Sequence, residues 1–296
     1  MMTAKGKKRL KTGLLVMLVG LSLIYLLGPP TWMVKSSISS DLELRKVPPN
    51  LFPPQPTFEH FRVILQLPGY DEDVLRENIH FQFYRRATFN SFVISLSTML
   101  IATLLGSVFA YWISRYVRAN VRRFVLLALL LSRMLPLISV LIPIYVMLLL
   151  TGMLDTLAGL IIVYSGLLLP FAIWILEGFY RHFPRDLEEA ATIDGASPFG
   201  VFIRIVIPLS WNGFFATGAF VFISTWSDFI VGFIMTSTER AYPLSVVIAR
   251  NMSVWREPDW GILNAAGLFA ALIPVAMAFM LRRLVMRGRF AGAVKG

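Results

Sequence analysis

The amino-acid sequence predicts an all-α membrane protein with six transmembrane helices and a helical elbow on its cytoplasmic side. Three observations predict this fold class. Of the 296 residues, 56% are hydrophobic and only 15% are charged, whereas soluble domains carry about 25% charged residues. The mean hydropathy is +0.68. Long stretches without Asp, Glu, Lys or Arg alternate with short basic clusters, which is the pattern of a membrane protein with several spans.

The composition and the missing motifs argue against several other classes. A net charge of +11 would suggest a nucleic-acid partner in a soluble protein, but here the basic residues lie between apolar runs. The chain has no cysteine, and it lacks a phosphate-binding loop and a nucleophile elbow. The three histidines, His60, His80 and His182, lie outside the expected spans and none has metal-ligand spacing. We therefore expect no catalytic residue, no bound metal and no nucleic-acid partner.

Six uncharged stretches are each about 21 to 28 residues long, and about 20 residues cross the hydrocarbon core. The first stretch follows a basic segment but lacks a small-residue cleavage site, so we expect a retained helix instead of a cleaved signal peptide. Pro29 and Pro30 are expected to kink or end its outer part. The spans are expected near residues 13–34, 88–114, 124–150, 157–177, 207–235 and 261–281.

The distribution of Lys and Arg sets the expected orientation. The N-terminal segment, the loop after the second span and the C-terminal segment carry basic residues and no acidic one, whereas the turn between the third and fourth spans carries only Asp155. Both termini are therefore expected in the cytoplasm, with the chain in a bacterial or archaeal inner membrane. We divide the chain into a cytoplasmic N-terminus (1–12) and a single transmembrane domain (13–296). This domain has outer loops at about 35–87 and 236–260, a cytoplasmic loop at about 178–206 and a cytoplasmic tail at 282–296.

The cytoplasmic loop predicts two helices joined by a turn. Residues 187–193 favour a helix, with acidic residues near its first turn where the helix dipole is positive. Asp194 and Gly195 form a turn signal, because glycine tolerates a positive φ. Ser197 and Pro198 then match an N-cap followed by proline at the first helical position. A second helix over residues 199–207 leads through Pro208 into the fifth span. On these grounds alone we favour a solvated hairpin with no partner, because runs of charged residues usually lie on a solvated surface.

The same loop resembles the EAA loop of ABC importer permeases. The matching residues are Glu189, Ala190 and Ala191, then Gly195 three residues later, then a closing Ile-Val-Ile-Pro run that ends at Pro208. The family pattern ends in I-x-L-P, so the isoleucine before Pro208 is a conservative departure. Further segments are similar to the maltose-type carbohydrate branch of that family over nearly the whole chain. These segments are Ile193–Ala196, Leu51–Pro53, Thr57–Phe61, Asn90–Ser91 and the tail Gly292–Gly296.

The resemblance implies a subunit of a larger importer. A second permease subunit would share the translocation pathway, two ATPase subunits would bind ATP and Mg beneath it, and an extracytoplasmic solute-binding protein would deliver a saccharide. This chain would bind no cofactor itself. In the family, the first helix of the loop is a coupling helix that docks on the ATPase. The coupling residues would be Glu188, Glu189, Ala190, Ala191, Asp194, Gly195 and Pro208, with Glu189 facing a basic ATPase residue.

Two charged residues interrupt the apolar spans. Arg133 lies in the expected third span and Asp228 in the fifth, and an intramembrane charge costs roughly 2.5–3.5 kcal/mol on insertion scales. They could pair with each other or line a water-filled pathway, together with Ser224, Trp226 and Asn264. The alternative is that these polar groups hold helices together. Pro136, Pro143 and Pro170 would permit the bends that alternating access requires.

Other functions compete with a sugar importer. An importer of glycerol-phosphate or another polar solute would have the same architecture, and Arg133 permits an anionic substrate. A stand-alone channel, a secondary carrier or a membrane scaffold would give no reason for the EAA-like elbow. The sequence does not identify the saccharide or the ATPase.

Overall fold

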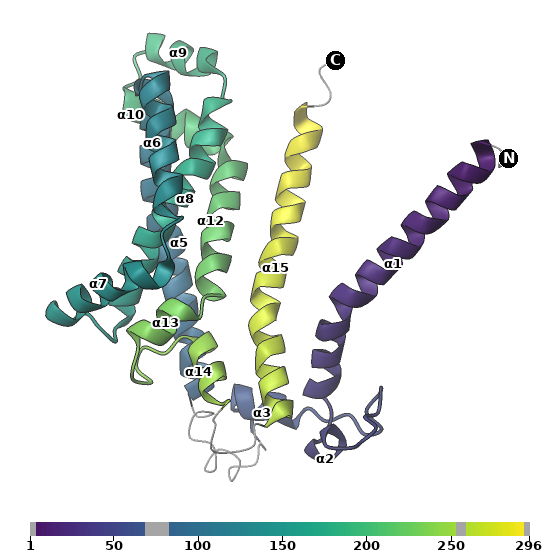
Figure 1. The fold of residues 1–296 in the computed structure, drawn as a ribbon. Helices are drawn as coiled ribbons and strands as arrows, with labels where there is room; N and C mark the ends of the chain where they lie inside the picture. Colours follow the sequence, from purple (N-terminus) through teal and green to yellow (C-terminus); the bar gives the residue numbers. More distant parts are fainter. Residues whose placement is uncertain (1–3, 69–82, 253–258, 293–296) are drawn as a thin grey trace. The chain divides into compact units, whose positions relative to one another are not determined.

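The computed structural model describes residues 4–68, 83–252 and 259–292, and the chain forms two compact units. The first unit comprises residues 1–82 and 250–271, and the second comprises residues 83–249 and 272–296. Every regular element in the described residues is a helix (Figure 1). Four helices are long and apolar enough to cross a membrane, and two bent helix pairs raise the number of spans to six if each pair counts once. The predicted all-α membrane class is confirmed.

The first unit contains the N-terminal helix, two short helices and the beginning of the C-terminal helix. The predicted outer loop at 35–87 is therefore partly helical, since it holds both short helices. The helices are α1 (Ala4–Ser37), α2 (Asp41–Leu44), α3 (Glu59–Leu65) and α15 (Trp260–Gly292), of which residues up to 271 belong to this unit.

Helix α1 continues through Pro29 and Pro30 to Ser37, so the prolines do not end it. The ribbon bends toward its C-terminal part (Figure 1), as a proline that removes a helical hydrogen bond would allow. Leu14 and Ile24 are examples of its many exposed apolar side chains. These exposed side chains fit a helix that faces lipid or another membrane subunit.

The second unit contains most of the predicted spans. Its helices, in chain order, are α5 (Tyr84–Tyr116), α6 (Ala119–Ser132), α7 (Leu137–Leu150), α8 (Leu157–Arg181), α9 (Arg185–Ile193), α10 (Pro198–Val201), the π-helix η2 (Phe202–Val206), α11 (Ile207–Leu209), α12 (Trp211–Trp226), α13 (Ile230–Met235) and α14 (Leu244–Arg250).

The core of the second unit is formed by α5, α8 and α12, which pack along one another (Figure 1). Small residues permit the close approach of α5 and α8, because a β-carbon on Gly106 would lie only 2.9 Å from the β-carbon of Ala172. Gly213 in α12 likewise receives the ring of Phe179 from α8. Buried hydroxyls join the same helices, as where Ser107 lies 2.6 Å from the hydroxyl of Tyr180. Small and polar residues are the usual contacts between membrane helices, where burial alone gives little driving force.

The third predicted span is broken into two helices, at the position where Pro136 was expected to permit a bend. Helices α6 and α7 meet at an angle of 85° across the break that contains Arg133 and Pro136. Proline lacks the backbone N–H and disfavours helical backbone in the residue before it, which explains why α6 stops and a new helix begins after Pro136. Pro143 and Pro170 lie inside α7 and α8 without ending them.

The fifth span is also shorter than expected. Helix α12 ends at Trp226, and the residues up to Met235 form the separate helix α13. The cause is Asp228, whose Oδ1 accepts a hydrogen bond of 2.9 Å from the backbone N–H of Val231. Aspartate that bonds to the backbone a few residues ahead starts a new helix instead of continuing the old one.

The last helix is longer than expected. Helix α15 continues to Gly292, so most of the predicted tail at 282–296 is helical, and residues 293–296 lie outside the described residues. His80 and the part of the first outer loop at 69–82 also lie outside them, as do residues 253–258 of the second outer loop. The latter loop otherwise contains α14.

Candidate functional site

The elbow, defined here as residues 184–208, has the predicted helix–turn–helix form. Helix α9 ends at Ile193, and Gly195 follows with a φ of +86°, a backbone conformation that glycine adopts without strain. The Ser197 hydroxyl then accepts a hydrogen bond of 3.2 Å from the N–H of Gly200, with Pro198 at the first helical position of α10. The sequence signals for the turn and the N-cap are therefore both confirmed.

One face of α9 is held against α5. Glu188 forms an ion pair with Arg115, in which Nε and Nη2 donate to Oε1 at 2.8 and 2.5 Å. Tyr111 donates its hydroxyl proton to Oε2 of Glu188 at 3.0 Å. The side chain of Arg115 is only 8% exposed and that of Glu188 only 12%. Arg115 also donates to the carbonyl of Phe183 at the entry to the elbow. Glu188 is thus an internal anchor, a contact that the sequence pattern did not indicate.

The opposite face of α9 is open. Glu189 and Ala190 are exposed, and Ile193 is 86% exposed. Residues at positions 186, 189, 190 and 193 of one helix share a face, whereas position 188 lies opposite them. Phe199 of α10 is also 61% exposed. The α9 residues Asp186, Glu189, Ala190 and Ile193 therefore form one surface with two acids, a small residue and an apolar side chain, which we call the outward face.

The base of the elbow is rigidly packed. Phe202 of η2 stacks on Tyr111 with ring centroids 4.8 Å apart, and it meets Tyr180 edge to face. Val206 is completely buried in the same cluster. Pro208 lies in α11 at the end of this helical segment, and a break at Ser210 with a bend of 79° separates it from α12.

The predicted pathway residues meet only in part. Arg133, Ser224 and Asp228 line one pocket of about 370 Å³ between α7, α8, α12 and α13. Tyr164, which the sequence analysis missed because it lies in an apolar run, also lines this pocket. Its hydroxyl donates to Oδ1 of Asp228 at 2.9 Å, and the Ser245 hydroxyl donates to the Asp228 carbonyl at 2.7 Å. We call this region the polar pocket.

Arg133 and Asp228 share the polar pocket without forming an ion pair among the described residues. Arg133 is exposed and donates to the Leu167 carbonyl at 2.7 Å. Trp226 is instead buried, stacked on Phe222, and does not line the pocket. Asn264 belongs to the first unit, where its side chain donates to the carbonyl of Trp260 at 2.7 Å.

Two tethers hold the end of the second unit opposite the elbow (Figure 1). The Asn90 amide donates to the carbonyls of Arg240 and Tyr242, each at 3.1 Å, and Ser91 Oγ accepts from the N–H of Leu244 at 2.8 Å. These contacts give a structural role to the Asn90–Ser91 pair, which the sequence analysis noted only as a resemblance.

Asp155 forms the second tether. Its Oδ1 accepts from the N–H groups of Ser237 and Thr238 at 2.9 and 3.1 Å, and Oδ2 accepts from the Thr238 hydroxyl. Partial burial raises the pKa of Asp155, but these hydrogen bonds outweigh it and leave the pKa below its ordinary value. The turn before α8 is thereby fastened to the segment after α13.

Comparison with known proteins gives consistent matches over most of the chain. A family model described as a binding-protein-dependent transport system inner membrane component matches residues 84–288. The trehalose transport permease SugB of Mycobacterium tuberculosis is 32% identical over 275 residues, which cover 92% of this chain and 93% of SugB. The trehalose/maltose transport permease MalG of Thermococcus litoralis is 30% identical, with coverage of 97% and 98%.

Solved structures share the fold. A crystal structure of a bacterial ABC transporter involved in the import of the acidic polysaccharide alginate matches with a TM-score of 0.77 at 16% identity, covering 96% of this chain and 98% of that chain. The same type of transporter in complex with an alginate pentasaccharide-bound periplasmic protein matches with a TM-score of 0.66 at 17% identity, covering 95% of each chain. At this identity the match concerns the fold alone.

Proposed function

The chain belongs to the family of inner-membrane components of binding-protein-dependent transport systems, and from that premise we propose that it is a sugar-importing permease subunit driven through its elbow by a separate ATPase. The observation that carries this proposal is the division of α9 into two faces. Glu188 anchors one face internally, while Glu189, Ala190 and Ile193 on the other face are exposed. A surface that combines two acids with a small alanine and an exposed isoleucine fits a protein partner, because alanine permits close approach and the acids can face basic residues of the partner.

The partners follow from this arrangement. Two ATPase subunits would bind ATP and Mg and dock on the outward face, and a second permease subunit would complete the pathway. A solute-binding protein would deliver the substrate, in keeping with the family description. The basic N-terminus supports a topology in which both termini and the elbow lie in the cytoplasm and the tethered loops lie outside. This chain would then be non-catalytic, and ATP and Mg would be bound by the ATPase subunits alone.

The substrate class is a sugar or oligosaccharide. This substrate class is supported by the similarity to trehalose and trehalose/maltose permeases, which are at least 30% identical to this chain over nearly its whole length. The polar pocket adds hydroxyl and charged groups beside the ring of Phe171, a combination that suits sugars. Because Arg133 is exposed in that pocket, the uptake measurements should include both a neutral disaccharide and an acidic oligosaccharide.

Charge reversal at the outward face tests the coupling role. Glu189→Lys should abolish substrate-stimulated ATP hydrolysis in the assembled transporter, because like charges at an interface cost several kcal/mol. The control is Glu239→Lys, which makes the same charge change at an exposed position far from the elbow. Stimulated hydrolysis should be unaffected by that control.

Rescue makes the test specific. An acidic substitution of one basic residue in the docking groove of the ATPase should restore stimulated hydrolysis to the Glu189→Lys transporter. Normal assembly and normal stimulated hydrolysis in Glu189→Lys would exclude Glu189 from coupling. Equal damage from Glu239→Lys would point to surface charge in general.

A further inference from the structure

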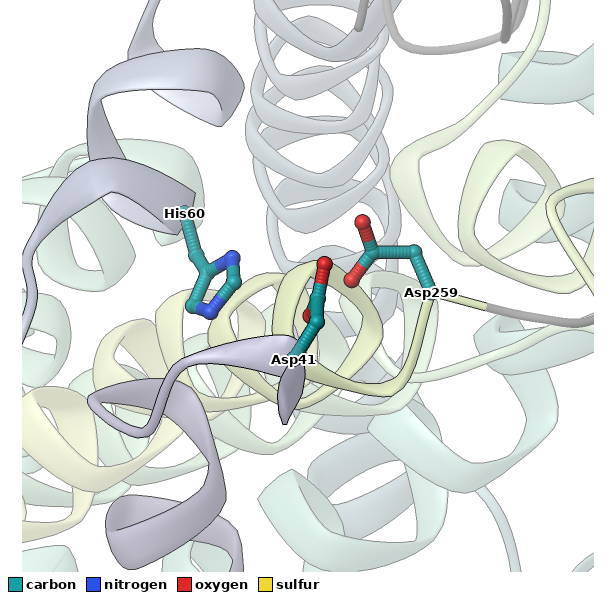
Figure 2. Close-up of side chains that lie close together, drawn as sticks. All are labelled: Asp41, His60 and Asp259. Carbon is teal, nitrogen blue, oxygen red and sulfur yellow. The ribbon is translucent and has the colours of Figure 1, made fainter. Parts of the chain in front are cut away.

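Three side chains of metal-binding type converge in the first unit (Figure 2). They are Asp41 at the start of α2, His60 in α3 and Asp259 directly before α15. One ligand atom from each side chain lies within 4.8 Å of the other two. The residues are 19 to 218 positions apart in the sequence, which is why spacing alone gave no sign of a metal site.

The hydrogen bonding of His60 prepares its other ring nitrogen for a cation. His60 is only 6% exposed, and its Nε2 lies 2.9 Å from the carbonyl oxygen of Ser39. A carbonyl only accepts, so Nε2 carries the proton, and Nδ1 of the neutral ring keeps its lone pair. Metal-binding histidines typically donate their second ring nitrogen to a backbone carbonyl in this way, which fixes the tautomer and the ring orientation.

The basic group beside the two carboxylates is His60 itself. Among the residues that the structure describes, no Lys or Arg forms an ion pair with Asp41 or Asp259. Asp259 uses Oδ1 to accept a hydrogen bond of 2.9 Å from the N–H of Ile262, which caps α15. A carboxylate has about four acceptor sites, so lone pairs of Asp259 remain for a further ligand. Two carboxylates beside a ring nitrogen favour a positive charge between them, which either a proton on the imidazole or a bound metal ion can supply.

The backbone is shaped to allow this approach. A β-carbon on Gly261 would collide with the ring of His60. Only glycine therefore lets the first turn of α15 lie against the imidazole. The contact brings Asp259, at the same helix end, to the ring that α3 supplies.

We propose that Asp41, His60 and Asp259 bind one divalent transition-metal ion, with Zn²⁺ the best fit, which fastens the segment 39–60 to the start of α15. An imidazole with carboxylates suits zinc and its neighbours, whereas Mg²⁺ and Ca²⁺ prefer oxygen ligands alone. Zinc lies about 2.0–2.2 Å from nitrogen and oxygen ligands, so two ligands of one ion are at most about 4.4 Å apart. Because Asp41 is exposed, a small rotation of its side chain brings the three groups to that spacing. Water would take the fourth position.

Zinc titration of the purified full chain tests the proposal. The chain should carry a tag without histidines, and a chromophoric chelator should compete for the ion. We expect one equivalent of zinc in the wild type and binding at least about tenfold weaker in Asp41→Asn and in Asp259→Asn. Asparagine is also a good N-cap, so Asp259→Asn keeps the end of α15 while removing the charge. X-ray absorption of the bound zinc should show one imidazole ligand and oxygen ligands.

Matched variants separate this site from surface binding. Glu59→Gln removes an exposed acid next to His60, and His182→Gln removes a histidine of the second unit; both should bind zinc as the wild type does. The proposal is overturned if the wild type binds no zinc, if Asp41→Asn binds it equally well, or if His182→Gln abolishes binding. Displacement of the zinc by equimolar Ca²⁺ would also overturn it, since it would indicate an oxygen-only site.

Discussion

Removing the Glu188 carboxylate should destabilise the second unit strongly, although the neighbouring Glu189 is exposed. Glu188→Ala leaves the Arg115 guanidinium buried, at 8% exposure, without its partner. It also removes the acceptor of the Tyr111 hydroxyl. Breaking a buried ion pair by deleting one partner costs about 3–5 kcal/mol, because the remaining charge is uncompensated.

Further variants separate the loss of the Glu188 charge from the loss of its hydrogen bonds. Glu188→Gln keeps an acceptor for Arg115 and Tyr111 but loses the charge, and should cost less, about 1.5–3 kcal/mol. Replacing both Arg115 and Glu188 with methionine removes both buried charges and should recover much of the loss. Glu189→Ala is the matched control, because Glu189 is exposed and surface substitutions usually stay within about 0.5 kcal/mol.

The assay is the free energy of unfolding in mixed micelles titrated with a denaturing detergent. The order of stability should be wild type and Glu189→Ala, then the double methionine variant and Glu188→Gln, then Glu188→Ala. Equal stability of Glu188→Ala and Glu189→Ala would refute the anchor. A double methionine variant less stable than Glu188→Ala would refute the reasoning about the unpaired charge.

Three further outcomes are expected. Asp228→Ala should lower uptake per assembled transporter more than it lowers assembly, since it removes a charge from the polar pocket; uptake unchanged in proteoliposomes would make Asp228 purely structural. Asn90→Ala should cost about 1–3 kcal/mol and raise hydrogen exchange in residues 240–244, because it leaves two carbonyls without their donor; unchanged exchange there would contradict the tether. Asp155 has a lowered pKa, so the stability it adds over Asp155→Ala should be full above pH of about 4 and should shrink as the pH falls below that value; a difference that grows on acidification would show the opposite sign.

The resemblance to ABC importer permeases is confirmed by the family match, and much of the fold was predictable from local signals. Charge-free length located the membrane helices, and Asp194, Gly195 and Ser197 marked the turn and the cap of the elbow. Hydropathy could not show the breaks in the third and fifth spans, because it averages over the residues that cause them. Pro136 and the side chain of Asp228 act locally, over three or four residues.

Contacts between residues far apart in the sequence could not be predicted. Arg115 and Arg122 served only as orientation signals, yet Arg115 pairs with Glu188 and Arg122 lies 3.5 Å from Glu177. The hydrogen bond from the Tyr164 hydroxyl to Asp228, 64 positions away, was likewise not predictable from the sequence. A pair of this kind depends on how helices pack, and no periodicity within one segment specifies it. The sequence also could not tell which of two adjacent acids, Glu188 or Glu189, faces inward, since that depends on where α5 lies.

Helix α5 connects the two ends of the second unit. It carries Tyr111 and Arg115, which hold the elbow, and Asn90 and Ser91, which hold the segment 240–244. Asn90 and Arg115 are 25 residues apart in one unbroken helix, which at 1.5 Å per residue is roughly 37 Å. The elbow therefore cannot shift relative to α5 without breaking a buried ion pair, and α5 cannot shift relative to the outer segment without breaking hydrogen bonds. If a partner moves the outward face of α9, as we propose, α5 is the element that would carry the movement to the outer segment, and the Glu188 and Asn90 variants would interrupt that connection at opposite ends.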